Sequence, residues 1–554
     1  MTFSTDFTRR GVLCGAAAAL TILAPGGAAR TTQPSIARGR VRTADGAGVP
    51  GVMVTNGRDV VTTGGDGQYE LSVNRDCIIS VVKPSGYAIA LDPDTKLPRH
   101  YYVHRPTGSP AHIPFAYPGV AATGPLPSSI DFTLTKRDEP TAFNVILFAD
   151  PQPETDAEVD FIRDGVIPAA AGVDAAFGVT LGDIVGDDLS LYGRINGLIG
   201  TLEKPWYNVC GNHDLNYESP DNSFARETFI RTFGPSHYAF EHGEAMFIML
   251  DNVVYEGADP TEPGQMGRYH DGISDEQLDF VANVLARTPP SRLIVLGMHI
   301  PLRSRRDHSG REIATDDCAR LLDIIGDRPA VSFAGHTHMA EHRYIWRTGA
   351  GAPHHHQVLT TVCGSWWSGP FDRRGVAIAD ACDGAPSGFY VLSVNGNSCR
   401  TTFRPTNEPA ARQVRAVLCE RPEAEYAGKV TPKLRRATLR AHEAQTTEIV
   451  ANVFDGGPRT LVFCSVDHGP EIAMRREDRT DPFVAAVYAN NREAIKPWVK
   501  AERSTHVWAA PLPGDLTPGA HAISIRATDE FGRTHRETLA FEIQSSDRMI
   551  AGRG

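Results

Sequence analysis

The sequence has no cluster of basic residues. Its formal net charge is -11, and its 55 Lys and Arg are spread along 554 residues. Proteins that bind nucleic acids or anionic membrane surfaces usually gather positive charge in one patch or block. The sequence therefore predicts no nucleic-acid-binding patch, and it leaves small diffusible substrates open.

The nine cysteines show no CxxC pair or other metal-binding spacing. This absence excludes a zinc ribbon, and a chain of this length does not need disulfides to form a core. Cys210 and Cys464 lie in apolar runs, so we expect them to be buried small hydrophobes. One disulfide among Cys363, Cys382 and Cys399 remains an open alternative, because pairing cannot be deduced from sequence.

No apolar run of the mature chain is long enough to span a membrane. Near the N-terminus the pair Arg9-Arg10 precedes an apolar run at 12–24 and small residues at 27–29. This order is typical of a cleaved export signal over residues 1–30, and the arginine pair favours the twin-arginine route. A general secretory signal with an incidental arginine pair is the alternative. We expect an exported protein, periplasmic or extracellular.

The pattern of apolar segments and turn residues changes twice along the mature chain. Residues 35–137 and 404–546 consist of short apolar segments divided by Gly, Asp, Asn and Pro, which favours two β-sandwich domains. In the second of these regions we expect strands at 446–454, 461–466, 483–488, 506–510 and 521–529. Residues 140–403 between them form a different kind of domain.

Three continuous apolar runs in this middle region each end in polar residues. The runs are 143–149 before Asp150 and Gln152, 175–181 before Asp183, and 207–210 before Asn212. Helical patterns at 154–171 and 188–202 follow the first two runs. Strands in which apolar and polar residues do not alternate, followed by helices, predict a sheet that is covered on both faces. The polar residues that follow the strands would then lie at one edge of this sheet.

Two further runs end in histidine. Residues 293–298 precede His299, and residues 330–334 precede His336 and His338. Before them, Ser274 and Gln277 have the spacing of a helix capping box. Carboxylate, amide and imidazole groups at five strand ends are the donors that two divalent cations about 3.5–4 Å apart require.

As an ordered set, these motifs resemble the calcineurin-like binuclear metallophosphoesterase family. The matching residues are Asp150-x-Gln152, Gly182-Asp183-x-x-Gly186-Asp187, Gly211-Asn212-His213-Asp214, His299 and Gly335-His336-x-His338. The resemblance implies a four-layer α/β catalytic domain of mixed β-sheets covered by helices. The flanking β domains resemble those of an exported bacterial subgroup of the family.

The family's ligand pattern carries over residue by residue. It implies that Asp183 bridges two divalent metal ions, with Mn, Fe and Zn as the candidates. Asp150, Gln152 and His338 would complete one site, and Asn212, His299 and His336 the other; His213 would face the leaving group, oriented by Asp214. Gln152 stands where the commonest pattern has histidine, which bears on metal preference.

The segment after the last predicted ligands contains Gly364-Ser365-Trp366-Trp367. We expect Trp366 and Trp367 either to wall a substrate cleft or to pack in the core. The triple histidine His354-His355-His356 has no ligand spacing, and it is expected to form a solvated loop.

These expectations favour an exported metal-dependent phosphoesterase that uses a metal-activated hydroxide. Its substrate would be a small-molecule, surface-glycan or lipid phosphate ester, either a monoester or a diester. The alternative is a non-catalytic glycan-binding or scaffold protein that retains the fold. The sequence does not fix the metals, the substrate or the oligomeric state.

Overall fold

The computed structural model describes residues 35–258, 267–305, 312–315, 317–347, 349, 351–422 and 431–544. The described residues belong to one compact unit that begins at Ser35. The predicted export signal at residues 1–30 lies outside them. Among the described residues, no helix has the length and apolar character needed to cross a membrane.

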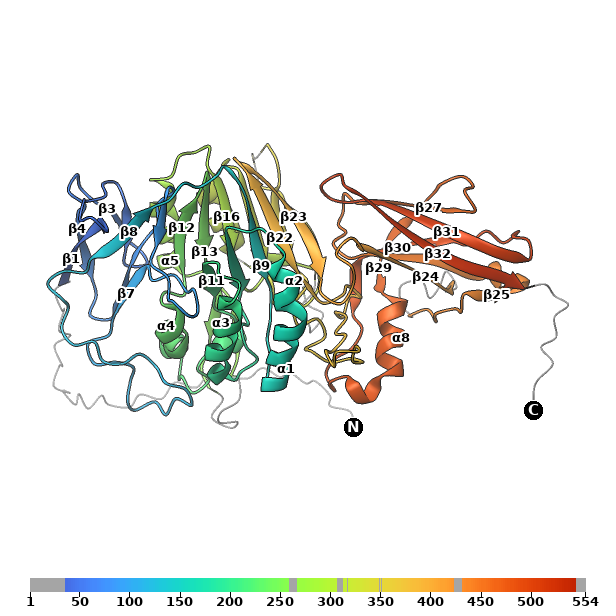
Figure 1. The fold of residues 1–554 in the computed structure, drawn as a ribbon, viewed down its shortest axis with the longest axis horizontal. Coiled ribbons are helices and arrows are strands. Elements are labelled where there is room, and N and C mark those ends of the chain that lie inside the picture. The colour runs from blue at the N-terminus through green and yellow to red at the C-terminus, as the bar shows by residue number, and fades with distance from the viewer. Residues whose placement is uncertain are drawn as a thin grey trace, which may run out of the picture. The chain divides into compact units, whose positions relative to one another are not determined.

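The N-terminal domain consists of two four-stranded sheets, in the orders β4-β1-β8-β6 and β3-β2-β5-β7 (Figure 1). The strands are β1 Ser35–Thr43, β2 Met53–Thr55, β3 Val60–Thr62, β4 Gln68–Val73, β5 Cys77–Val81, β6 Tyr87–Ile89, β7 Tyr101–His104 and β8 Phe132–Lys136. In β4 every second side chain is buried, because successive side chains of a strand point to opposite faces. Side chains of both sheets form one core, which makes this domain a sandwich.

The middle region contains two larger sheets, in the orders β11-β10-β9-β22-β23 and β12-β13-β16-β19-β21-β20. The strands of the first are β9 Ala142–Phe148, β10 Phe177–Leu181, β11 Trp206–Val209, β22 Gly388–Asn395 and β23 Ser398–Pro405. Those of the second are β12 Tyr238–His242, β13 Ala245–Met249, β16 Leu293–Gly297, β19 Ala330–Ala334, β20 Glu341–Ile345 and β21 His354–Val358. All five predicted apolar runs are therefore strands, although they divide between two sheets.

Four layers follow from the composition of the cores. One core joins the facing sides of the two sheets and includes Leu147 of β9 and Val295 of β16. A second core packs the outer side of the first sheet against α1 (Asp156–Phe161), α2 (Ile167–Ala171) and α3 (Tyr192–Gly200). A third packs the outer side of the second sheet against α5 (Asp275–Leu285) and α6 (Asp317–Ile325). The expected four-layer α/β fold is confirmed.

The predicted helical regions 154–171 and 188–202 contain α1 to α3, and the predicted capping box stands at the start of α5. The Thr155 side chain caps α1, and a π-helical turn, η1 (Ile162–Val166), joins α1 to α2. The Ser274 hydroxyl accepts a hydrogen bond from the Gln277 backbone at the start of α5. The Gln277 side chain does not return to the cap, because it pairs with the backbone of Asp251 at 2.9 and 2.7 Å.

The C-terminal domain has a four-stranded sheet, β24-β26-β30-β29, and a five-stranded sheet, β25-β32-β31-β27-β28. Its strands are β24 Val414–Glu420, β25 Thr438–Arg440, β26 Thr447–Val453, β27 Leu461–Val466, β28 Ile472–Ala473, β29 Arg475–Thr480, β30 Arg503–Pro511, β31 Gly519–Thr528 and β32 Thr534–Gln544. Both sheets contribute to one core. All eight cysteines from Cys77 to Cys464 are free, so the disulfide alternative is wrong.

Two local predictions are wrong. The expected strand at 483–488 is helix α8 (Pro482–Asn490), because the Asp481 side chain caps it and proline occupies the first turn. The triple histidine is strand β21, with His354 and His356 buried. Both imidazoles lie 2.7 Å from the Ser332 hydroxyl, so hydrogen bonding inside the sheet replaces the expected solvation.

Candidate metal centre

The polar residues that end the five central strands meet at one edge of the two sheets. Asp150 and Gln152 follow β9, Asp183 follows β10, Asn212 follows β11, His299 follows β16, and His336 and His338 follow β19. Six of these seven side chains are buried, and His336 is half-buried. Strand ends of parallel sheets bring residues that lie far apart in the chain into one site.

The backbone at this edge is strained. Eight of the twelve non-glycine residues with positive φ in the described chain belong to the site or adjoin it, and they are Asp150, Gln152, Asp183, Asp187, His336, His338, Trp366 and Trp367. Non-glycine residues rarely adopt this conformation, and it persists where surrounding structure enforces it. The orientation of these side chains is therefore maintained at a cost in stability.

Two glycines make room for the buried carboxylates. A Cβ on Gly211 would lie 2.2 Å from the Asp183 backbone nitrogen and 2.2 Å from its Oδ1. A Cβ on Gly335 would lie 2.1 Å from Asp150 Oδ2. The motif glycines are thus explained by close approach of backbone to side chain.

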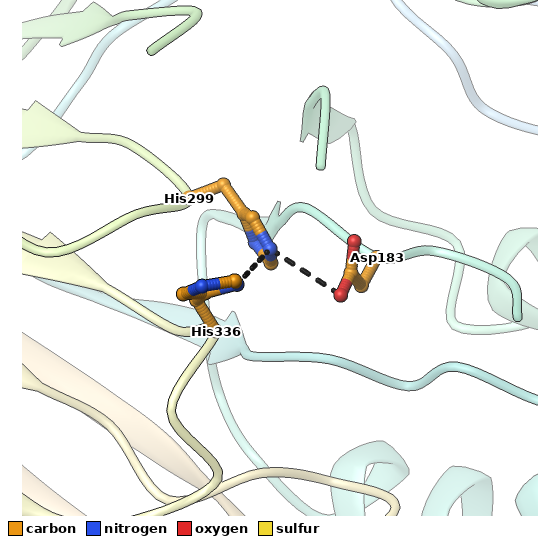
Figure 2. A group of neighbouring side chains, drawn as sticks. All are labelled: Asp183, His299 and His336. Carbon is orange, nitrogen blue, oxygen red and sulfur yellow. Dashed lines mark hydrogen bonds and ion pairs between the residues drawn. The ribbon is translucent and has the colours of Figure 1, made fainter. Parts of the chain in front are cut away.

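Asp183, His299 and His336 lie close together (Figure 2). One ligand atom from each lies within 4.8 Å of the others. His299 Nε2 is 3.3 Å from Asp183 Oδ2 and 3.2 Å from His336 Nδ1. Asn212 Oδ1 is 3.0 Å from the same His299 nitrogen. The structure therefore brings together the four residues predicted to share one metal ion.

A hydrogen bond of Nδ1 to the backbone fixes the orientation of the His299 imidazole. Its Nδ1 donates to the Leu181 carbonyl at 2.9 Å, so its Nε2 faces the cluster. Asn252 accepts hydrogen bonds from the backbone of His299 and Ile300 at 3.2 and 3.0 Å. Sequence reasoning missed Asn252, which has no motif of its own.

The remaining predicted ligands are Asp150, Gln152 and His338. Asp150 accepts from the His336 backbone at 2.9 Å, and its Oδ1 lies 3.7 Å from His338 Nε2. The Gln152 backbone donates to the Asp183 carbonyl at 3.0 Å. Cys363, another residue that sequence reasoning missed, has its Sγ 3.6 Å from His338 Nδ1 and 3.9 Å from Gln152 Oε1.

Burial and mutual charge shift the pKa values of this cluster. Burial raises the pKa of Asp150 to about 8, with His299 opposing the shift and Asp183 adding to it. Burial also disfavours the His299 cation, yet Asp183 and Asp150 raise the pKa of that imidazole to about 9. Buried carboxylates need compensating cations. The mixture of carboxylate, amide and imidazole donors fits divalent ions such as Mn²⁺, Fe²⁺ and Zn²⁺.

His213 and Asp214 do not pair as expected. The Asp214 carboxylate accepts hydrogen bonds from Gly211 N at 2.8 Å, Ile184 N at 3.1 Å and the Tyr192 hydroxyl at 3.0 Å. These contacts brace the turn that carries Asn212 and His213. The prediction that Asp214 orients the His213 ring is wrong, because the short turn directs the two neighbouring side chains apart.

The partner of His213 is Asp187. His213 Nδ1 lies 2.5 Å from Asp187 Oδ1, and the Tyr217 hydroxyl donates to the same oxygen. Burial opposes the His213 cation, but Asp183 and Asp187 raise its pKa to about 9. Asp187 stands in the Gly-Asp-x-x-Gly-Asp motif, so the sequence contained the signal for this role.

The adjacent residues Trp366 and Trp367 have different environments. The Trp366 ring stacks on His338, with centroids 4.0 Å apart and planes at 18°. The Trp367 side chain is buried in the core, and its Nε1 donates to the Pro151 carbonyl at 2.7 Å. Of the two alternatives for this pair, the cleft wall applies to Trp366 and core packing to Trp367.

A cavity of about 580 Å³ opens beside His213 and Gln152. Its lining residues are Gln152, Glu154, Gly186, Asp187, His213, Trp366, Cys382, Trp498, Lys500 and Glu502. The size lies within the range of small-molecule sites.

Comparison with solved structures finds two-metal and purple acid phosphatases. A dimetal phosphatase from Danio rerio aligns with 15% identity and a TM-score of 0.31, over 47% of this chain and 98% of that chain. The purple acid phosphatase PPD1 from yellow lupin (Lupinus luteus) seeds aligns with 12% identity and a TM-score of 0.33, over 68% of this chain and 72% of that chain. Among curated proteins, no match is found.

Family models match most of the chain. Residues 143–340 match the calcineurin-like phosphoesterase model, residues 35–119 match the model of its N terminal part, and residues 356–535 match the model of its C terminal part. The chain therefore belongs to the calcineurin-like phosphoesterase family, as a binuclear metal-dependent phosphoesterase with flanking N- and C-terminal domains.

Proposed function

We propose that this phosphoesterase is exported and hydrolyses a phosphate monoester or diester in the cavity beside His213. The convergence of seven nitrogen and oxygen donors from five strand ends, six of them buried, is the observation that carries the proposal. Asp183 would contact both ions. Asp150, Gln152 and His338 would hold one ion, and Asn212, His299 and His336 the other.

The two divalent ions, when bound, supply Lewis-acid charge beside the phosphoryl group and lower the pKa of a water molecule. The chain itself supplies the proton for the leaving group. His213 lines the cavity, and its contact with Asp187 favours the imidazolium form. An imidazolium at this position can donate a proton to the departing alkoxide.

Gln152 would affect the affinity and the preference of one metal site. An amide oxygen is neutral and harder than an imidazole nitrogen, so the ion beside Gln152 would be held less tightly and would favour Mn²⁺ over Zn²⁺. The alternative is that Gln152 only hydrogen-bonds near the ions.

Export rests on the sequence of the first thirty residues. A twin-arginine signal carries folded protein, so metals could be loaded before export. Replacing Arg9 and Arg10 together by Lys should strand the precursor in the cytoplasm. Unchanged export would instead assign the general secretory route.

The central test is Asp183→Asn, assayed on small-molecule, glycan and lipid phosphate esters with metal analysis of the same samples. We expect the loss of most bound metal and nearly all turnover, with the flanking domains still folded. Two retained metals with normal turnover would refute the bridging role. A wild-type protein loaded with metal that hydrolyses none of the esters would favour the scaffold alternative.

A further inference from the structure

The outer wall of the cavity comes from the C-terminal domain. Trp498, Lys500 and Glu502 line the cavity together with His213 of the catalytic domain. We propose that residues 491–502 determine substrate specificity by binding an uncharged ring in the leaving group. The proposal deepens the proposed function and rests on it.

The wall is anchored to the catalytic domain along its length. Lys496 Nζ lies 2.8 Å from Glu158 and 3.1 Å from Glu154. The Gly369 backbone donates to the Ala494 carbonyl at 2.9 Å. Further along, the Glu502 backbone donates to the Cys382 carbonyl at 2.9 Å. These contacts hold the wall in one position without substrate, so little ordering is needed on binding.

Val499 adds an apolar anchor. Its side chain is buried in a small cluster with Cys382, Val484 and Tyr488. Trp498, the preceding residue, is 55% exposed. The chain thus buries the smaller apolar side chain and presents the larger one to the cavity. An exposed indole on an anchored segment indicates a binding surface.

Two indoles line the same cavity. Trp366 has a φ of 52°, a conformation that aromatic residues rarely adopt. Lys496 Nζ lies 5.6 Å from the centre of the Trp498 ring, which favours one orientation of that indole. Flat, rigid aromatic faces bind sugar and aromatic rings by stacking.

The cavity is larger than a phosphate group. Five heavy atoms occupy roughly 150 Å³ at about 30 Å³ per heavy atom, the share of a water molecule in the liquid. A cavity of about 580 Å³ then leaves space for about a dozen further heavy atoms, the size of a hexose or a nucleobase with part of its ribose.

The charge of the lining argues for an uncharged ring. The cations of the wall already have acidic partners: Lys500 lies 3.1 Å from Glu502, and Lys496 lies between Glu154 at 3.1 Å and Glu158 at 2.8 Å. The wall offers no excess charge to a charged leaving group. Stacking and polar contacts remain as its means of recognition.

The test compares esters of primary alcohols, which have similar intrinsic reactivity. They are glycerol 3-phosphate without a ring, glucose 6-phosphate with a sugar ring, and a nucleoside 5′-phosphate with a sugar and an aromatic base, each also as its methyl diester. The readout is the ratio of kcat/KM for a ring-bearing ester to that for the glycerol ester. Binding of each ester is measured by calorimetry in the same samples.

We expect the wild type to prefer one of the ring-bearing esters, and Trp498→Ala to lower the ratio roughly 5- to 100-fold. Trp498→Phe should keep most of it. Trp346→Ala is the matched control, because Trp346 is 68% exposed and does not line the cavity. Which ring-bearing ester is preferred distinguishes a sugar from a nucleoside.

The outcomes separate the two proposals. Turnover with a ratio that Trp498→Ala does not change overturns the ring-binding wall and leaves the proposed hydrolysis standing. Binding that depends on Trp498 without any turnover supports the wall and overturns the hydrolysis. Neither turnover nor binding overturns both.

Discussion

Gly211→Ala probes how tightly the buried carboxylate is placed. Gly211 has φ -103° and ψ -179°, a conformation that alanine adopts without strain. The effect of the substitution is therefore steric. The new Cβ would lie 2.2 Å from both the backbone nitrogen and Oδ1 of Asp183, whereas Cβ contacts essentially never fall below 3.0 Å.

Relieving this overlap requires a movement of about 0.8 Å between Gly211 and Asp183. The movement acts on a carboxylate that lies 3.3 Å from His299 and accepts from His213 N at 2.9 Å. A misplacement near 1 Å can cost about 10²-fold in rate, which equals about 2.7 kcal/mol in the barrier. Overpacking costs a further 1–3 kcal/mol of stability, roughly.

The assay combines kcat/KM, bound metal and thermal unfolding. Gly197→Ala is the matched control, because Gly197 lies in α3 with no heavy atom within 4 Å of the added Cβ. The control should keep wild-type activity and gain up to about 1 kcal/mol of stability from helix propensity. Gly211→Ala with activity within about threefold of wild type and full metal would refute the steric argument.

Three further predictions follow from individual side chains. His213→Ala should keep bound metal and lower kcat for esters with poor leaving groups by roughly 10²–10⁴, but less for nitrophenyl esters; equal losses would argue against a proton donor. Gln152→His should tighten the weaker Mn²⁺ site and shift preference toward Zn²⁺ in reconstitution; unchanged affinities would show that Gln152 is not a ligand. Burial, aided by nearby positive charge, lowers the pKa values of His354 and His356 to about 4 and 3, so the folded chain leaves both neutral where the unfolded chain protonates them. Their contribution to stability is complete above pH ~6.5 and falls by about 2.7 kcal/mol per pH unit between roughly pH 6 and 4.5. Denaturant unfolding of the wild type and of His356→Asn at pH 7, 6 and 5 compares the two slopes, and the slope of the variant should be smaller by about 1.4 kcal/mol per pH unit; an unchanged slope would contradict the assignment.

The sequence by itself determined the central strands and the residues that end them. Apolar runs of four to seven residues bury both faces of a strand, and the polar residues that follow cannot join that core. The cap of α5 was also readable, because Ser274 acts on a residue three positions away. In each case the physical cause lies within a short stretch of chain.

Only the tertiary structure decided which neighbours these residues have. His213 contacts Asp187 across 26 positions rather than the adjacent Asp214. Trp366 lines the cavity while Trp367 is buried in the core. Residues 491–502, which include Trp498, belong to another domain, and no local sequence pattern connects them with the metal centre. Packing between distant segments sets these contacts, and a pattern of neighbouring residues contains no information about which distant surface will cover them.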